Sequence, residues 1–326
     1  MTAKRVAVTG GAGFIGSHVV ERLLQLDCWV TLIDNFNDSY DPRLKRRNIE
    51  SVCNEIALSV VEGDILDDSL LVDCLVRDRI DVVIHLAGRT NSFVSIHQPK
   101  EFIETNVQGT LSVLEAMRTA GTKKIIFASS FAVYGNLTKP AAEETDPLHE
   151  PLSPYAVSKV AAENLCHAYH ATHGMNAYCL RLFNVYGPRQ RPDAAIPLMV
   201  DAITNKRPIQ IFGNGASKRD YVYIDDVVDG IVGAVERVKG FEVINIGEGQ
   251  AISLEKLVQQ LEIRTGQKAV REESPMPPSD VYRSCADIRK AHKLLGYDPQ
   301  VSFIEGLGRY YRWRQGTPAP VTRNVG

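Results

Sequence analysis

The sequence lacks the features that mark several protein classes. It has no run of 18 apolar residues, and no apolar signal segment separates Met1 from the first β-rich run. Its six cysteines form no CxxC pair and lie in segments that read as strands or helices, so we expect reduced core thiols. Neither sign of charge dominates, since 37 Lys and Arg stand against 39 Asp and Glu. We interpret the single basic cluster, Lys45-Arg46-Arg47, as a solvated loop. These absences predict a soluble cytoplasmic protein with no nucleic-acid partner, no membrane partner and no metal site.

Apolar β-rich runs alternate with helical patterns through the first 180 residues. Strands are expected at 5–9, 29–33, 58–61, 81–86, 124–128 and 177–182, and helical stretches near 67–78, 100–119 and 155–172. Strands that alternate with helices require right-handed crossovers and a parallel sheet buried on both faces. The pattern therefore predicts a doubly wound α/β fold of the Rossmann type.

The length of 326 residues exceeds what one compact core usually spans, so either two domains or one large domain with a lobe is expected. Proline and glycine cluster at 187–197, 207–215 and 274–278, which indicates a smaller, loop-rich lobe in the second half. We place the dinucleotide-binding domain at 1–183 and the substrate-binding lobe at 184–326. The segments near 221–246 are candidates to return to the main sheet.

A glycine-rich motif follows the first strand: Thr9-Gly-Gly-Ala-Gly-Phe-Ile-Gly16. Gly10, Gly13 and Gly16 permit a tight turn, close approach to a pyrophosphate, and close packing of helix on strand. The N-terminus of the next helix then offers free N–H groups to phosphates. Strand, glycines, helix, second strand and acid appear in that order, which favours a dinucleotide over a plain glycine turn.

Acidic residues end the next two strands. Asp34 stands where a carboxylate can bind both adenosine ribose hydroxyls, and no arginine from Asn35 to Tyr40 would favour a 2′-phosphate. NAD is therefore expected as the cofactor rather than NADP. Asp64, after the third strand, is either an adenine contact or a helix N-cap.

Tyr155 and Lys159 are spaced i, i+4, which places a phenol and an ammonium on one helical face. A nearby cation stabilises a phenolate, so we expect the pKa of Tyr155 to move from about 10 towards neutrality and the residue to act as a general base. Pro154 and Ser153 suit a helix start just before it. Ser130 ends a strand beside the point where such sheets bind ligands.

These motifs resemble the extended short-chain dehydrogenase/reductase family, within it the NAD-dependent nucleotide-sugar epimerases and dehydratases. Further matching segments are His85-Leu-Ala87, Thr105-Asn-Val-Gln-Gly-Thr110, Phe127-Ala-Ser-Ser130, Val133-Tyr-Gly135, Arg181-Leu-Phe-Asn-Val-Tyr-Gly-Pro188, Arg219-Asp-Tyr-Val-Tyr-Ile-Asp225 and Asn245-Ile-Gly247. The resemblance implies that Tyr155 is the base, that Lys159 holds the nicotinamide ribose and that Ser130 bonds the oxygen at C4. It also implies cofactor contacts at Phe14, Ile15, Asn35, Ile65, Leu86, Ala87, Gly88 and Asn106, and UDP-sugar contacts at Thr90, Asn184, Arg191, Phe212, Arg219 and Asp280.

The two residues after Ser130 discriminate between reactions within that family. Family members that dehydrate the sugar, and those that decarboxylate a uronate, carry acids there, whereas this chain has Phe131 and Ala132. A 4-keto intermediate would then take its hydride back on the opposite face, so 4-epimerisation is expected. A nucleotide-sugar reductase or a non-catalytic dinucleotide sensor stays an alternative.

The segments 34–45 and 187–193 look like those of UDP-glucuronate 4-epimerases, and Arg191 is the candidate partner of a uronate carboxylate. Phe93 replaces an arginine usual in those enzymes, and Asn184 replaces a threonine. Ser284 leaves room for a larger C2 substituent, so UDP-glucose and UDP-N-acetylglucosamine remain alternatives. Helices 100–119 and 155–172 carry apolar residues on more than one face. Relatives pair these two helices with their copies, so the resemblance implies a homodimer built on them; burial of both helices within one subunit is the alternative.

Overall fold

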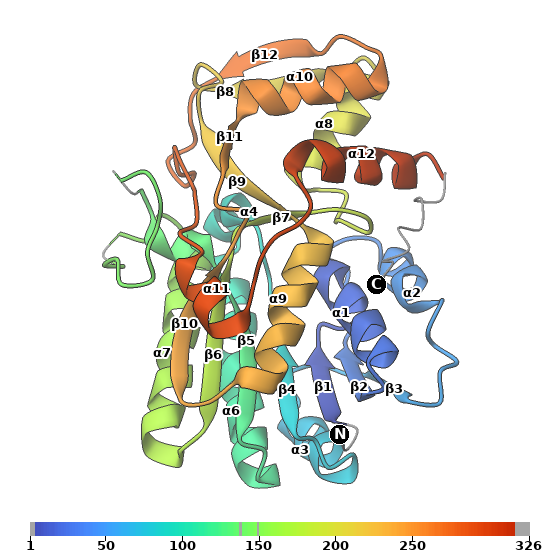
Figure 1. Cartoon of the computed structure of the whole chain (residues 1–326), viewed down its shortest axis with the longest axis vertical. Helices are drawn as coiled ribbons and strands as arrows, with labels where there is room; N and C mark the ends of the chain where they lie inside the picture. Colours follow the sequence, from blue (N-terminus) through green and yellow to red (C-terminus); the bar gives the residue numbers. More distant parts are fainter. Residues whose placement is uncertain (1–3, 137–138, 149, 317–326) are drawn as a thin grey trace.

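A seven-stranded parallel sheet forms the centre of the protein (Figure 1). The computed structural model describes residues 4–136, 139–148 and 150–316, so Met1 and the outer ends of both predicted domains lie outside the described part. The strand order is β10 (Phe241–Ile246), β6 (Asn176–Leu182), β5 (Lys124–Ser130), β4 (Val82–His85), β1 (Arg5–Thr9), β2 (Trp29–Asp34) and β3 (Leu58–Glu62). This is the 3-2-1-4-5-6 order of a dinucleotide-binding fold with one strand added, and the predicted fold class is confirmed.

Helices cover both faces of the sheet. One face carries α1 (Phe14–Gln25) and α9 (Ile224–Arg237), which pack on each other. The other carries α3 (Asp68–Arg77), α6 (Gly109–Ala120) and α7 (Pro154–His173). Ser153 caps α7 by accepting a hydrogen bond from the Ala156 N–H, and Pro154 occupies its first turn, as the sequence predicted.

The expected helix 100–119 is not one continuous α-helix. It consists of α5 (Pro99–Ile103), a π-helical turn η1 (Glu104–Gln108) and α6. The short helix α4 (Ser92–His97) precedes it. Such π turns occur frequently at functional sites, and this one carries Asn106.

The second half of the chain builds a smaller lobe at one end of the sheet (Figure 1). It holds two small sheets, one of β11 (Ala251–Ser253), β9 (Lys218–Tyr223) and β7 (Asn184–Tyr186), and one of β12 (Val270–Ser274) and β8 (Pro208–Phe212). Helices α8 (Ala195–Thr204), α10 (Leu254–Thr265) and α12 (Phe303–Arg314) lie around them, while α11 (Arg289–Leu295) packs against α9 and β10. Of the segments near 221–246, β10 joins the main sheet and β9 belongs to the lobe.

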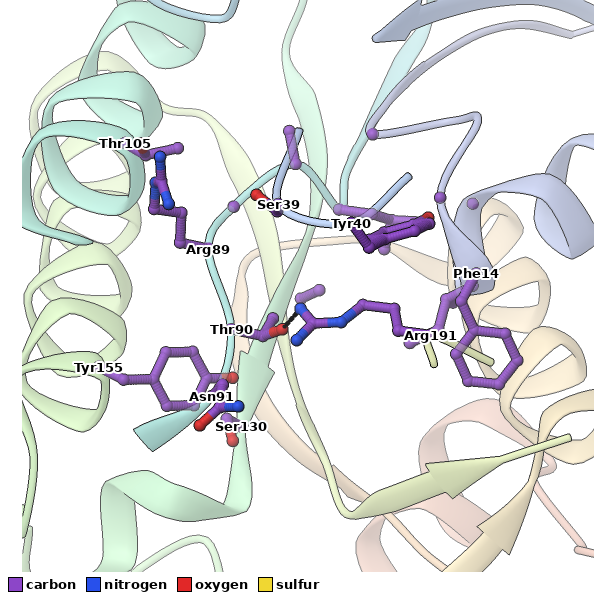
Figure 2. A pocket seen from close by; sticks show the side chains of 18 of the residues that line it. Phe14, Ser39, Tyr40, Arg89, Thr90, Asn91, Thr105, Ser130, Tyr155 and Arg191 are labelled. Atoms are coloured by element: carbon purple, nitrogen blue, oxygen red, sulfur yellow. Dashed lines mark hydrogen bonds between the residues drawn. The ribbon is translucent and has the colours of Figure 1, made fainter. Parts of the chain in front are cut away.

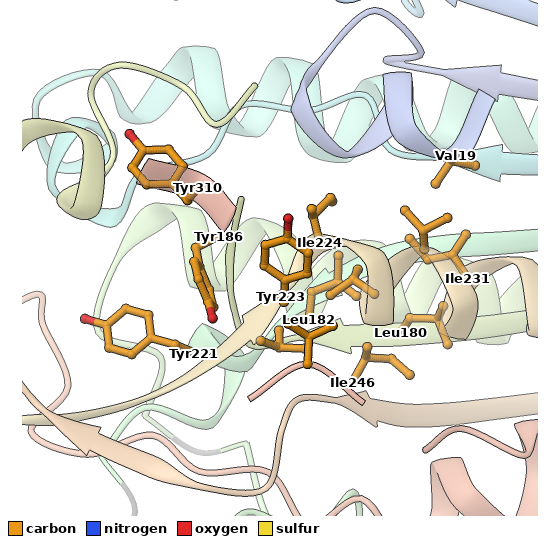
Figure 3. Close-up of a cluster of buried hydrophobic side chains, with 14 of the residues drawn as sticks. Val19, Leu180, Leu182, Tyr186, Tyr221, Tyr223, Ile224, Ile231, Ile246 and Tyr310 are labelled. Atoms are coloured by element: carbon orange, nitrogen blue, oxygen red, sulfur yellow. The ribbon is translucent and has the colours of Figure 1, made fainter. Parts of the chain in front are cut away.

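One buried cluster runs from the main sheet into this lobe. Figure 3 shows tyrosines of the lobe beside Leu180, Leu182 and Ile246 of the main sheet. The rings of Tyr186 and Tyr223 meet edge to face with centroids 5.6 Å apart, an arrangement that adds about 0.5–1.5 kcal/mol beyond area burial. The two predicted domains therefore share one continuous core.

Two minor expectations were wrong. Lys45-Arg46-Arg47 lies in helix α2 (Pro42–Ile49), where Asp41 caps the N-terminus, and Lys45 is buried. Ile49 of that short helix packs in the core, and Lys45 and Asn48 are buried on the same face, which the run of charges concealed. Cys53 is exposed, whereas the other five thiols are buried. Among the described residues, no helix is both long and apolar enough to cross a membrane.

Candidate active site

A cavity of about 880 Å³ lies at the carboxyl ends of β1, β2, β4 and β5. The strand order reverses between β1 and β4, which is where open α/β sheets bind ligands. Most of the predicted site residues line this cavity: Gly10, Gly13, Phe14, Ile15, Gly16, Asp34, Asn35, Asp64, Ile65, Leu86, Ala87, Gly88, Thr90, Ser130, Tyr155, Lys159, Asn184 and Arg191.

The glycine turn is packed so closely that Gly10 and Gly16 have no space for a side chain. A Cβ on Gly10 would lie 2.7 Å from the Ala87 nitrogen, and one on Gly16 would lie 2.1 Å from the Gly10 oxygen. Gly13, as the N-cap of α1, has no side chain with which to cap, so the first N–H groups of the helix are left for an anion. These features fit the pyrophosphate of a dinucleotide.

Asp34 is held by backbone donors at the end of β2. Its carboxylate accepts hydrogen bonds from the Ala12 N–H at 3.1 Å and the Phe36 N–H at 2.8 Å. Asp64 accepts from the Asn35 amide at 2.6 Å and from the Leu66 N–H at 2.9 Å. The suggestion that Asp64 is a helix N-cap was wrong, because Asp67 caps α3.

Asn106 lies just behind the cavity wall. Its amide accepts from the Arg89 N–H at 2.7 Å, donates to the Arg89 carbonyl at 3.0 Å, and donates to the Ser158 hydroxyl at 2.9 Å. Asn106 therefore holds the segment after β4 against helix α7.

Ser130, Tyr155 and Lys159 line the same cavity. Figure 2 shows the phenol of Tyr155 directed towards Ser130, at the end of β5. Lys159 donates from Nζ to the Ala128 carbonyl at 2.8 Å and lies over the Phe127 ring. The Phe102 ring packs edge to face on Tyr155, which limits the positions that its phenol can take.

The pKa of Tyr155 differs from the expectation. Burial raises the pKa of Tyr155, and a hydrogen bond with Ser130 and the charge of Arg191 oppose that rise. The expected fall towards neutrality was wrong for the protein alone, because the Lys159 ammonium bonds a carbonyl instead of the phenol. Burial also lowers the pKa of Lys159 to about 8, against the charge of Glu163 one turn further along α7.

Glu163 belongs to a buried network that the sequence did not reveal. It accepts from Nε and Nη2 of Arg181 at 2.9 and 2.7 Å and from the Ser129 hydroxyl at 2.5 Å. The network joins α7, β6 and the end of β5 directly behind Ser130. Its only sequence signal is that Glu163 follows Lys159 at the i, i+4 spacing.

The two residues that follow Ser130 in the cavity wall are apolar. Phe131 and Ala132 both line the cavity, and the Phe131 ring stacks on Phe183 with centroids 5.6 Å apart. Neither side chain can donate or accept a proton at this place.

Arg191 projects into the cavity from the segment between β7 and α8. Its guanidinium donates from Nε and Nη2 to Asp193 at 3.0 and 2.5 Å and from Nη1 to the Thr90 hydroxyl (Figure 2). An arginine has five N–H donors, so these three bonds leave donors for a ligand. The side chain is 22% exposed, which argues against a freely solvated loop residue.

Three predicted substrate residues are not part of the cavity wall. Arg219 on β9 donates to Asp280 at 2.7 Å, and Phe212 ends β8, so all three belong to the C-terminal lobe. Asn184 does line the cavity and donates to Ser284 at 3.1 Å. Ser284 lies behind Asn184 and is itself buried.

Tyr40 and Lys45 are among the residues of the cavity wall that sequence reasoning missed. Lys45 donates to Asn37 at 2.8 Å and lies over the Tyr40 ring, and burial lowers its pKa. The resemblance of segment 34–45 to UDP-glucuronate 4-epimerases is the signal that pointed to this region.

The model of the NAD-dependent epimerase/dehydratase family matches residues 6–247. The chain belongs to that family. A UDP-glucuronate 4-epimerase of Thermodesulfobacterium geofontis is 38% identical over 94% of this chain and 94% of its own length. The crystal structure of UDP-glucuronic acid 4-epimerase from Bacillus cereus, in complex with UDP-glucuronic acid and NAD, superposes with a TM-score of 0.90 at 36% identity, covering 96% of this chain and 99% of that one.

Family membership alone does not select the reaction. The dTDP-glucose 4,6-dehydratase DesIV from Streptomyces venezuelae, with NAD bound, has a TM-score of 0.89 at 34% identity over 96% of this chain and 97% of that one.

Proposed function

We propose that the protein is an NAD-dependent UDP-glucuronate 4-epimerase, which interconverts UDP-glucuronate and UDP-galacturonate. The observation that carries this proposal is the wall of the cavity around Ser130 and Tyr155. This wall contains the Ser130 hydroxyl and the Tyr155 phenol beside the apolar side chains of Phe131 and Ala132. Arg191 lines the same cavity. The similarity to UDP-glucuronate 4-epimerases supports it.

In the proposed reaction Tyr155 takes the proton of the C4 hydroxyl, and Ser130 holds the C4 oxygen. When bound, NAD would supply the acceptor for the C4 hydride. Inversion at C4 requires that this hydride come back to the opposite face of the 4-keto sugar, with Tyr155 giving the proton back to the C4 oxygen. Lys159 and Asp34 hold the nicotinamide and adenosine riboses, and Gly10, Gly13 and Gly16 admit the pyrophosphate. Since Phe131 and Ala132 have no acid–base group, no proton transfer from them leads to elimination or decarboxylation.

Arg191 binds the uronate carboxylate in this proposal. Removing one partner of a buried charge pair costs about 3–5 kcal/mol, so Arg191→Ala should lower kcat/KM for UDP-glucuronate about a hundredfold or more. Residual turnover of UDP-glucose should stay nearly unchanged. Equal losses on both sugars would place Arg191 at the shared diphosphate and remove the main support for a uronate.

The decisive assay is product analysis by NMR with UDP-glucuronate, UDP-glucose and UDP-N-acetylglucosamine. An epimerase converts one of them without added reductant and without net change in NADH, whereas a reductase consumes NADH or NADPH. UDP-glucuronate as the preferred substrate is the expected result. Conversion of only the neutral sugars would contradict the proposal.

The remaining predicted roles belong to the same proposal. Phe212, Arg219 and Asp280 would bind the uridine and the diphosphate, and Asn106 would act near the nicotinamide.

A homodimer is supported by exposed apolar side chains on the segments 100–119 and 155–172, since Val157 is 44% exposed and Ile103 is 43% exposed. Light scattering should give twice the chain mass at micromolar concentration, and a monomer mass would contradict the dimer. The cytoplasm is the proposed location.

A further inference from the structure

The segment 187–194, which carries Arg191, is tied to helix α1 across the molecule. The His18 ring nitrogen Nε2 donates to the Pro188 carbonyl at 3.0 Å. Arg189 donates from Nη2 to Glu21 at 2.7 Å and from Nη1 to the Ser17 hydroxyl at 3.3 Å. Two consecutive residues of the segment thus contact three residues on the side of α1.

Helix α1 is fixed in position by its close packing, so it can fix the position of the segment attached to it. Its N-terminus is the glycine turn, where Gly16 packs against the Gly10 backbone with no room for a Cβ. The His18 ring also meets the Phe14 ring edge to face, with centroids 6.0 Å apart, and Phe14 lines the cavity. The attachment therefore begins at the surface that receives the pyrophosphate.

The attached groups have the burial and charge that a lasting contact needs. The side chains of Arg189 and Glu21 are only 21% and 22% exposed, and Glu21 also accepts from Ser51 at 2.8 Å. Burial lowers the pKa of His18 to about 4, with the charge of Arg189 acting in the same direction. The imidazole is therefore neutral near pH 7, and its Nε2–H can donate a hydrogen bond to the Pro188 carbonyl at that pH.

Arg189 also adopts a backbone conformation that side chains rarely take, with φ of 64°. Such a conformation costs free energy and persists only where the surroundings enforce it. The next residue but one is Arg191, whose guanidinium points into the cavity. A fixed Arg189 therefore limits where Arg191 can lie.

We propose that His18, Arg189 and Glu21 are positioning residues, a latch that holds segment 187–194 on α1 and thereby places Arg191 for the substrate carboxylate. The role of Arg191 in this proposal rests on the proposed function. The latch joins the helix that receives the dinucleotide phosphates to the segment that receives the sugar. It acts through Arg191 and needs no contact of its own with the substrate.

The test compares Arg189→Ala and Glu21→Gln with Arg22→Ala in the NAD-bound protein. Arg22 is the matched control, because it lies next to Glu21 on α1 and pairs with Asp229 at 3.6 Å in an exposed position. Both latch variants should weaken binding of UDP-glucuronate about tenfold, which corresponds to about 1.4 kcal/mol. Affinity for UDP, which has no sugar carboxylate, should not change, and the NAD content should equal that of the wild type. Arg189→Lys should recover part of the affinity, since it keeps the charge facing Glu21.

Two measurements decide whether the latch acts through Arg191. In an Arg191→Ala background, Arg189→Ala should cost less than twofold; a full tenfold loss there would overturn the proposal. Hydrogen exchange of the amides in 187–194 should rise in both latch variants and not in Arg22→Ala, whatever the substrate is. Unchanged exchange refutes the latch, whereas raised exchange in a protein that does not convert UDP-glucuronate refutes only the proposed function.

Discussion

Replacing Glu163 by glutamine tests how much the network behind Ser130 contributes to stability. The carboxylate and the Arg181 guanidinium are 7% and 4% exposed and lie 2.7 Å apart. Breaking such a buried pair from one side leaves an uncompensated charge and costs about 3–5 kcal/mol. Glutamine keeps the size and one acceptor oxygen, so the lower end of this range, about 3 kcal/mol, is expected.

An unfolding entropy of about 2.1 cal/mol/K per residue gives about 1.5 °C per kcal/mol for a chain of 326 residues, so the loss corresponds to a fall in Tm of about 4–5 °C. Thermal unfolding with excess NAD measures it, and Glu62→Gln is the control. Glu62 pairs with Arg46 at 2.9 Å, but both side chains are more than half exposed, so its loss should stay below about 1 kcal/mol. The double variant Glu163→Gln, Arg181→Met leaves no unpaired charge and should recover part of the loss. Equal Tm shifts for Glu163→Gln and Glu62→Gln would refute the reasoning.

Three further predictions concern the reaction and the cofactor. Tyr155→Phe should leave folding and NAD content intact and lower kcat by about 10²–10⁴; unchanged turnover would remove Tyr155 from its role. Asp34→Ala should weaken binding of NAD more than that of NADP, because only the ribose hydroxyls of NAD gain from the carboxylate; titration of both cofactors checks this, and a preference of the wild type for NADP would contradict it. The pKa of Lys159 is lowered to about 8, so its ammonium is lost as the pH rises through that value and kcat/KM should fall on the alkaline side. Glu163→Gln should move this limb to lower pH, since the Glu163 charge raises the pKa of Lys159, and an unmoved limb would contradict that coupling.

The parts of the site that the sequence predicted depend on short-range spacing. The glycine turn with Asp34 lies within one βαβ unit, and Tyr155 and Lys159 lie one helical turn apart. Such relations need no knowledge of the tertiary structure, because the local element sets the geometry. The alternation of strands and helices predicted the sheet for the same reason.

The remaining features depend on contacts between distant segments. Lys45 reads as part of a charged run, and only the packing of α2 on the cavity wall reveals that it is buried. Arg189 and Glu21 are 168 residues apart, and the pairing of Glu163 with Arg181 requires α7 to pack against β6. The pKa of Tyr155 was misjudged because spacing alone placed the ammonium at the phenol, whereas the fold directs it to the Ala128 carbonyl.

The π-helical turn at Glu104–Gln108 has a consequence for the phase of the helix around it. An α-helix advances about 100° per residue, so the wider turn shifts the register of α6 relative to α5. In this register the amide of Asn106 faces Arg89 and Ser158 while the apolar residues of α6 still face the sheet. Deleting one residue from the turn would restore a regular α-helix. Asn106 could then not face Arg89 and Ser158 while the apolar residues of α6 face the sheet. The π-helical turn thus lets Asn106 hold the segment after β4 while α6 packs on the core.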